Sequence, residues 1–105
     1  MKTVEVIFQS HHAAVSDYMR HRTRRAIDKA AQRLHRPVAG VARFEEDGPT
    51  RRVELLVHWP GHRIVAGGSG RSFRTAISSA IQHLKAQTRQ SKRTPKSRTR
   101  HLARA

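Results

Sequence analysis

Basic side chains at helical spacing are the residues of this 105-residue chain whose types and positions could do chemistry. Arginine outnumbers lysine 17 to 5, and its planar guanidinium suits bidentate contact with phosphate and stacking on bases. Like charges repeated three and four positions apart destabilise a solvated helix, so the pattern indicates a polyanionic partner. We call this row the cationic ridge and expect it on the face opposite the core; its members are Arg22, Arg25, Lys29, Arg33 and Arg36.

A second group of cations surrounds another helical segment nearer the C-terminus. If about six of all these side chains replaced counterions on RNA, the logarithm of the binding constant would fall against the logarithm of salt concentration with a slope of about −4 to −5. We therefore predict that both groups contact a nucleic-acid backbone. The second group consists of Arg71, Arg74, Lys85, Arg89, Lys92 and Arg93.

The charge of the whole chain points to the same partner. The sequence has 22 Lys and Arg against 7 Asp and Glu, a formal net charge of +15, and every acid lies within residues 1–54. An anionic membrane surface is disfavoured because the basic segments lack the wide aromatic and leucine face of an interfacial helix. With 5% aromatic residues, the candidates for base stacking are Tyr18 and Trp59, and Trp59 fits equally well as a lid over the sheet edge.

Histidines offer a weaker, enzymatic interpretation. The adjacent His11 and His12, and the pair His58 and His62, lack a third ligand at metal-site spacing, and the chain has no cysteine. We therefore expect no metal, no cofactor and no thiolate chemistry. Acid and base catalysis by two histidines beside a cation would make a small ribonuclease, which stays open as an alternative. The small apolar content, 36%, gives no reason to expect a small-molecule substrate.

The glycines at 67, 68 and 70 precede a helical segment, as in a phosphate-binding loop. No Lys followed by Ser or Thr closes such a motif here. We therefore predict that these glycines end a strand and let the chain reverse into the helix.

Hydrophobic periodicity predicts an α+β domain over residues 1–91 with the order β-α-β-β-β-α. Ser16 and Ser72 (or Ser69) are candidate helix N-caps, and Pro37 ends the first helix. The acidic run 45–47 precedes a Gly-Pro turn and offers partners to Arg51 and Arg52. The expected strands are 4–8, 38–45, 52–59 and 63–66, and the expected helices are 16–35 and 72 to about 90.

Residues 92–105 read as a basic tail that is disordered until it binds, because they hold too little apolar surface to fold alone. No apolar run approaches the roughly 18 residues of a membrane span. We therefore expect a cytoplasmic protein that does not bind membranes.

This order of elements, together with particular residues, resembles the ribosome hibernation-promoting factor and ribosome-associated inhibitor family. The resemblance covers about residues 4–93 and includes the strand end and helix cap of Phe8 to Asp17. The other stretches that carry it are the hairpin residues Val57, His58, Pro60, Gly61, Ile64 and Ala66 and the helix residues Ala76, Ile77, Ala80, Ile81, Leu84 and Gln87.

The resemblance implies a four-stranded sheet with two helices packed on one face, in a protein that is not an enzyme. It also implies binding to small-subunit ribosomal RNA in the decoding region, which would block or store idle ribosomes under stress. Family members usually have an acid at the start of the second helix, where this chain has Ser72. They usually have another acid after the Ala-Ile pair of that helix, where this chain has Ser78. Without the C-terminal dimerisation domain of long members, the chain resembles a divergent short form.

From the residues alone, other functions stay open beside ribosome binding. A stand-alone double-stranded RNA or DNA binding protein would carry similar electrostatics. A structural component of the ribosome would carry them as well.

Overall fold

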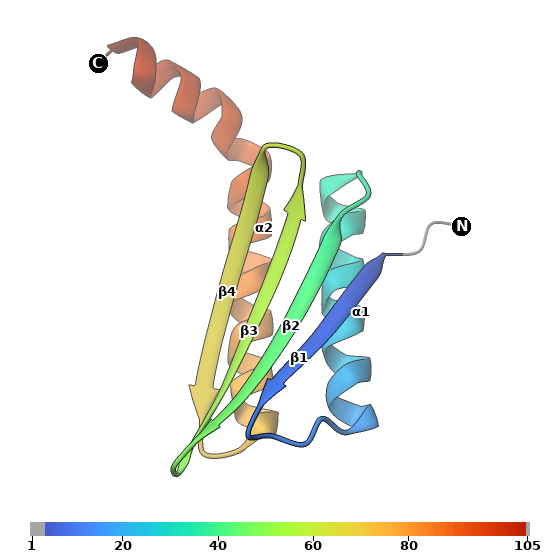
Figure 1. Ribbon diagram of the computed structural model, residues 1–105. Coiled ribbons are helices and arrows are strands. Elements are labelled where there is room, and N and C mark those ends of the chain that lie inside the picture. Colours follow the sequence, from blue (N-terminus) through green and yellow to red (C-terminus); the bar gives the residue numbers. More distant parts are fainter. Residues whose placement is uncertain (1–3, 105) are drawn as a thin grey trace.

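Six elements follow one another in the predicted order in a computed structural model of the chain (Figure 1). The structure describes the backbone of residues 4–104 and the side chains of residues 4–91. The elements are β1 (Glu5–His11), α1 (Asp17–Leu34), β2 (Ala39–Asp47), β3 (Thr50–Trp59), β4 (His62–Gly70) and α2 (Phe73–Arg104).

The strands form one mixed sheet in the order β1-β2-β3-β4. β1 pairs in parallel with β2, with Ile7 opposite Val41, because the crossover through α1 returns the chain to the same end of the sheet. The two following pairs are antiparallel hairpins. β3 is an interior strand with a neighbour on each side.

Both helices pack on the same face of this sheet, which confirms the predicted α+β fold (Figure 1). Alternate strand residues point into this layer and leave the opposite face without a covering element in the described part of the chain. The largest fully buried side chains of the core are Phe44, Ile27, Leu55, Ile77 and Leu84.

Helix α1 has the termini that its sequence predicts. The Met19 amide donates to Ser16 Oγ at 3.2 Å, which satisfies one of the free donors of the first turn. At the other end His35 adopts the left-handed conformation, with φ of 56°, and closes the helix before Pro37. The buried stripe of α1 is Met19, Thr23, Ala26, Ile27, Ala30 and Ala31.

The bounds of all four strands differ from the prediction, most of all in β1 and β4. β1 extends through residues 9–11, which pair with Arg43, Phe44 and Glu45 instead of forming a connection. β4 continues through its glycines to Gly70. The prediction that these glycines end the strand is wrong because Gly68 serves packing: a Cβ there would lie 2.4 Å from the Ala76 carbonyl oxygen of α2.

Helix α2 begins at its predicted cap, since the Thr75 amide donates to Ser72 Oγ at 3.2 Å. Its backbone continues to Arg104, well past the predicted end near residue 90. The prediction of a disordered tail over 92–105 concerns residues whose side chains lie outside the described part, and it stays a prediction, as does the domain boundary at 91. None of the described helices combines the length and apolar character needed to cross a membrane.

Candidate nucleic-acid interface

The two helices leave a groove between them on the outer side of the molecule, which we call the inter-helix groove. Its volume is ≈ 250 Å³. Short side chains, Ala26 and Ala30, let α1 approach α2 and form part of the apolar floor with Ile81 and Leu84. The cations that line the groove are Arg22, Arg25, Lys29 and Arg33 of α1 and Lys85 of α2.

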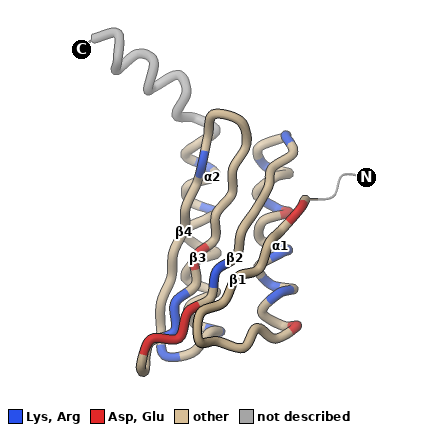
Figure 2. Tube along the Cα trace, viewed as in Figure 1, with Lys and Arg blue, Asp and Glu red and all other residues tan. Residues whose placement is uncertain are grey.

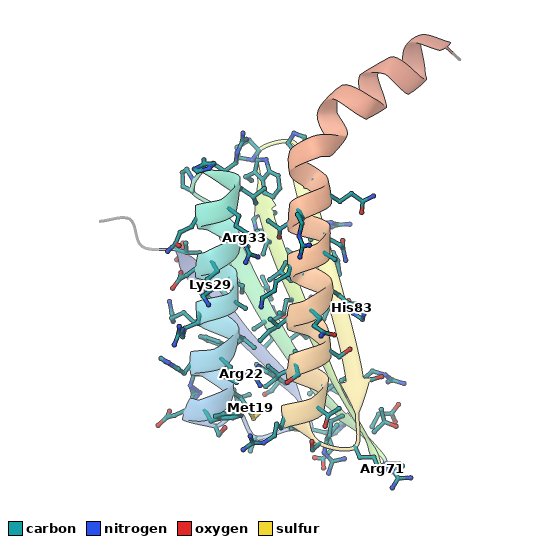
Figure 3. The ribbon with its side chains drawn as sticks, turned by 180° about the vertical axis from the view of Figure 1, so that it is seen from behind. Met19, Arg22, Lys29, Arg33, Arg71 and His83 are labelled. Carbon is teal, nitrogen blue, oxygen red and sulfur yellow. The ribbon has the colours of Figure 1, made fainter. Side chains whose placement is uncertain are left out.

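The cationic ridge, apart from Arg36, therefore lies on the flank of α1 that faces α2 and not, as the sequence predicted, on the face opposite the core. The prediction was wrong because Arg22 and Lys29 lie next to Ala26 on a helical wheel, at the border of the apolar stripe, and α2 packs along that border. Figure 3, seen from the helix side, shows Arg22, Lys29 and Arg33 following one another along α1. Arg22 reaches across to α2, where its Nη1 donates to Ser78 Oγ at 3.2 Å.

The groove cations keep their charge unneutralised by acids. Within residues 4–91, every ion pair involves an arginine outside the groove. The acids of the β2–β3 hairpin form ion pairs with arginines of the same hairpin, as predicted. Arg51 pairs with Glu46 at 2.6 Å, and Arg52 pairs with Asp47 at 2.9 Å. Figure 2 shows this acidic segment at the hairpin tip, apart from the basic residues of α1.

An aromatic ring lies beside cations from both helices near the N-terminal end of α1. Tyr18 is 43% exposed, with the Arg74 guanidinium carbon 5.2 Å and that of Arg22 5.8 Å from its ring centroid. Arg22 Nη1 also donates to the Tyr18 hydroxyl at 3.2 Å. These contacts bring Arg74 of α2 beside the ridge and leave one aromatic ring available to stack on a base.

The groove lining does not include Arg36, Arg71 or Arg89. Arg36 follows the end of α1, and its guanidinium carbon lies 5.7 Å from the ring centroid of Trp59. Arg71 lies at the end of the molecule near the hairpin tip, as Figure 3 shows. Arg89 is an exposed residue of α2 outside the groove lining. The side chains of Lys92 and Arg93 lie outside the described residues.

Trp59 is a lid and not a platform for bases. It is 8% exposed, and the imidazole of His62 stacks on it at a centroid distance of 5.3 Å. With Arg36 on the same ring, the indole is enclosed by its own chain.

Comparison with known proteins identifies the family. The model of the family described as sigma 54 modulation protein / S30EA ribosomal protein matches residues 6–96. The chain belongs to this family. The resemblance noted from the sequence is thereby confirmed, although no curated protein matches the chain.

Solved structures share the fold at low identity. A structure described as a ribosomal subunit interface protein from Coxiella burnetii superposes with a TM-score of 0.73 at 14% identity, and the match covers 85% of this chain and 98% of that one. The N-terminal domain of Thermus thermophilus Protein Y gives a TM-score of 0.68 at 12% identity, with 89% of this chain and 99% of that one covered. Both matches support the fold of a family member.

Ser78 stands where the family resemblance implies an acid, and it lies beside the groove. Ser78 is the residue to which Arg22 donates. A hydroxyl accepts the hydrogen bond but leaves the guanidinium charge in place. Serine at this position therefore keeps the groove more positive than an acid would.

The sequence reasoning missed two groove residues, His21 and Thr88. His21 could have been found, because it precedes Arg25 by one helical turn. Thr88 could not, because its hydroxyl is buried and donates to the Leu84 carbonyl at 2.7 Å, so its place beside the groove depends on packing. Among the described residues, the histidines and acids form no group of three or more that could hold a metal ion.

Proposed function

We propose that this chain binds small-subunit ribosomal RNA through the inter-helix groove and occupies the decoding region, so that idle ribosomes are blocked or stored in the cytoplasm under stress. It acts by binding and not by catalysis. The groove cations replace counterions on the phosphate backbone, and Tyr18 supplies one surface for stacking.

The observation that carries this proposal is the concentration of unpaired cations in one groove. Five basic side chains from two helices line it, and the ion-paired acids of the described residues lie elsewhere. A helix pair held at close range with like charges between its members gains stability when a polyanion enters. Ribosomal RNA supplies such a polyanion in a folded, rigid form.

Family membership supports the ribosome as the partner. The family description names a ribosomal protein, and one structure that superposes well is described as a ribosomal subunit interface protein. The small subunit and its decoding region are the further part of the proposal, which the family resemblance and the charge of the groove support.

Co-sedimentation with purified small subunits at physiological salt tests the ribosomal partner. We expect wild-type chain in the subunit pellet and loss of binding when Arg22, Arg25, Lys29 and Arg33 are all changed to Glu. A milder pair, R25Q/K29Q, should weaken binding, whereas R43Q/R52Q removes the same charge from the open sheet face and should not. Equal binding by the two pairs would show that net charge alone drives association.

Chemical footprinting tests the decoding region. Bound protein should protect decoding-region nucleotides of the small-subunit RNA, and subunits already loaded with messenger and transfer RNA should bind less protein. Protection elsewhere, with no competition, would separate ribosome binding from occlusion of this channel.

A stand-alone duplex-binding function is the second candidate, because cations that contact phosphates do not read base sequence. Excess duplex RNA or DNA should then displace the chain from subunits. We expect little displacement at duplex concentrations matched in phosphate. Cleavage of labelled RNA that depends on one histidine would instead support a ribonuclease, and constant stoichiometry with ribosomes in all growth phases would support a structural component.

A further inference from the structure

The face of the sheet opposite the helices carries a continuous apolar row. The register places Ile7 of β1 beside Val41 of β2, Val41 beside Leu56 of β3, and Leu56 beside Val65 of β4. Ile7 is 54% exposed and Val65 is 37% exposed, and both are among the large exposed apolar residues of the described chain. This row, which we call the apolar row, crosses all four strands on the face that no described element covers.

Charged residues on the same face balance one another. The paired rows beside the apolar row contain three glutamates and three arginines, and Asp47 adds one more acid beside Arg52, so this face is close to neutral in a chain of net charge +15. A neutral face with an apolar centre does not suit a polyanion. It suits a protein surface. The six residues are Glu5, Glu45, Glu54, Arg43, Arg52 and Arg63.

The arrangement of these charges is self-complementary. A two-fold axis parallel to the strands, passing between β2 and β3, places β1 of one copy over β4 of the other and keeps each row in register. Glu5 then faces Arg63 of the second copy, and the reverse pair forms by symmetry.

The inner strands repeat this match, because Arg43 faces the second copy's Glu54 and Arg52 faces the second copy's Glu45 under the same axis. Within one chain, Arg43 already pairs with Glu54 at 2.8 Å. The two copies would therefore join their ion pairs into four-charge networks on one side of the apolar row.

We propose that two copies of this chain associate face to face through these open sheets, with the two-fold axis parallel to the strands. Ile7 then packs near Val65 of the second copy, and Val41 near Leu56 of the second copy, as aligned sheets do at about 10 Å separation. Both inter-helix grooves point outward from this dimer. The proposal is therefore independent of the RNA-binding function and leaves it unobstructed.

The area predicts a weak, reversible dimer. Four strands about 4.8 Å apart, paired over about 23 Å, present about 450 Å² per copy. The total lies below the roughly 1,200–2,000 Å² of stable interfaces. Repulsion between two chains of charge +15 also opposes association over long range and is screened by salt, so the dimer should strengthen as salt rises. RNA binding should weaken over the same salt range.

Sedimentation equilibrium of the full chain, free of nucleic acid, tests the dimer. We expect a monomer–dimer equilibrium that shifts toward dimer by several-fold between about 50 mM and 500 mM salt, as the Debye length falls. A chain that stays monomeric at its highest soluble concentration and high salt overturns the proposal. The open sheet face would then be assigned to contact with a different protein. A dimer that dissociates as the salt concentration rises also overturns the proposal.

A charge exchange tests the geometry. The contact between position 5 and position 63 of the second copy occurs twice in the homodimer, so E5R or R63E alone creates two repulsive contacts. Each variant should lower the dimer's association constant about tenfold, because two exposed ion pairs are reversed. Mixing the two variants restores both attractive contacts, so the heterodimer should form as well as the wild-type dimer does. Failure of the mixture to recover, with both variants folded by circular dichroism, contradicts the parallel two-fold axis.

The apolar row has its own variant. I7T/V65T keeps β-branched side chains in both strands but removes apolar surface from the row, and we expect the dimer to be lost while RNA binding is retained. R25Q/K29Q should show the opposite behaviour, with weak RNA binding and an intact dimer. An unchanged dimer in I7T/V65T places the contact on another surface.

Discussion

Arg22 of α1 and Ser78 of α2 are joined across the inter-helix groove, with Nη1 donating to Oγ at 3.2 Å. The same guanidinium also donates to the Tyr18 hydroxyl. Neither acceptor carries a negative charge. The arginine is thus held in position by neutral groups, and neither acceptor offsets its attraction for an incoming phosphate.

Changing Ser78 to Glu should weaken RNA binding at this end of the groove. The carboxylate would pair with Arg22 and offset about 1 kcal/mol of its attraction for phosphate, which is about fivefold in affinity. Titration of small-subunit RNA by filter binding at physiological salt measures the change. A86E adds the same charge to an exposed position of α2 outside the groove lining, and it should weaken binding by clearly less than S78E. Equal effects of the two variants would mean that position 78 has no special role.

The salt dependence of RNA binding should report the number of groove cations in contact. A plot of log K against log salt should have a slope of about −4 to −5 for wild-type chain if about six cations replace counterions. R25Q/K29Q should make the slope shallower by about 1.5. R43Q/R52Q should leave it unchanged, since both arginines lie on the open sheet face and pair with acids. A slope near zero for wild-type chain would contradict phosphate contact altogether.

The sequence predicted the ridge residues of α1 but not the groove that holds them. Periodicity reports which side of a helix is apolar, and the stripe containing Ala26, Ile27 and Ala30 was correct. It does not report where a second helix packs. Lys85 joins the groove and Arg36 leaves it because α2 lies alongside α1 and the chain turns away at His35. Site residues contributed by tertiary packing were therefore outside the reach of spacing rules.

The strand boundaries show the same division. Alternation in β3 is strong, and its prediction was nearly complete. β4 was predicted too short because glycines have weak strand preference and resemble a turn. Their position is explained by the helix that packs over them, a contact between residues that only the folded chain brings together. A side chain of α2 also provides a hydrogen bond to this edge strand, since Gln87 Nε2 donates to the Val65 carbonyl at 2.9 Å.

Tyr18 should contribute to RNA binding through its ring and not through its hydroxyl. Y18L removes the ring beside Arg22 and Arg74, and loss of one stacked base should weaken binding by about 1–3 kcal/mol. Y18F keeps the ring and loses only an exposed hydrogen bond, so its affinity should stay within about threefold of wild type. Filter binding of both variants, with circular dichroism to confirm folding, decides between them. Equal losses in Y18L and Y18F would assign the effect to the hydroxyl and its bond to Arg22.

Gly68 and Gly67 provide a matched test of how closely α2 approaches the sheet. An added Cβ at Gly68 would lie 2.4 Å from the Ala76 oxygen and 2.5 Å from the Ala80 nitrogen, both backbone atoms that cannot rotate away. G68A should therefore lower the free energy of unfolding by about 1–3 kcal/mol through overpacking. At Gly67 the nearest atom is the Val53 oxygen at 3.8 Å, so G67A should be neutral or stabilise by about 0.4–1 kcal/mol through the unfolded chain. Urea unfolding of the two variants measures both values. A G68A variant as stable as G67A would show that α2 can shift outward, and the groove cations should then change their RNA affinity as well.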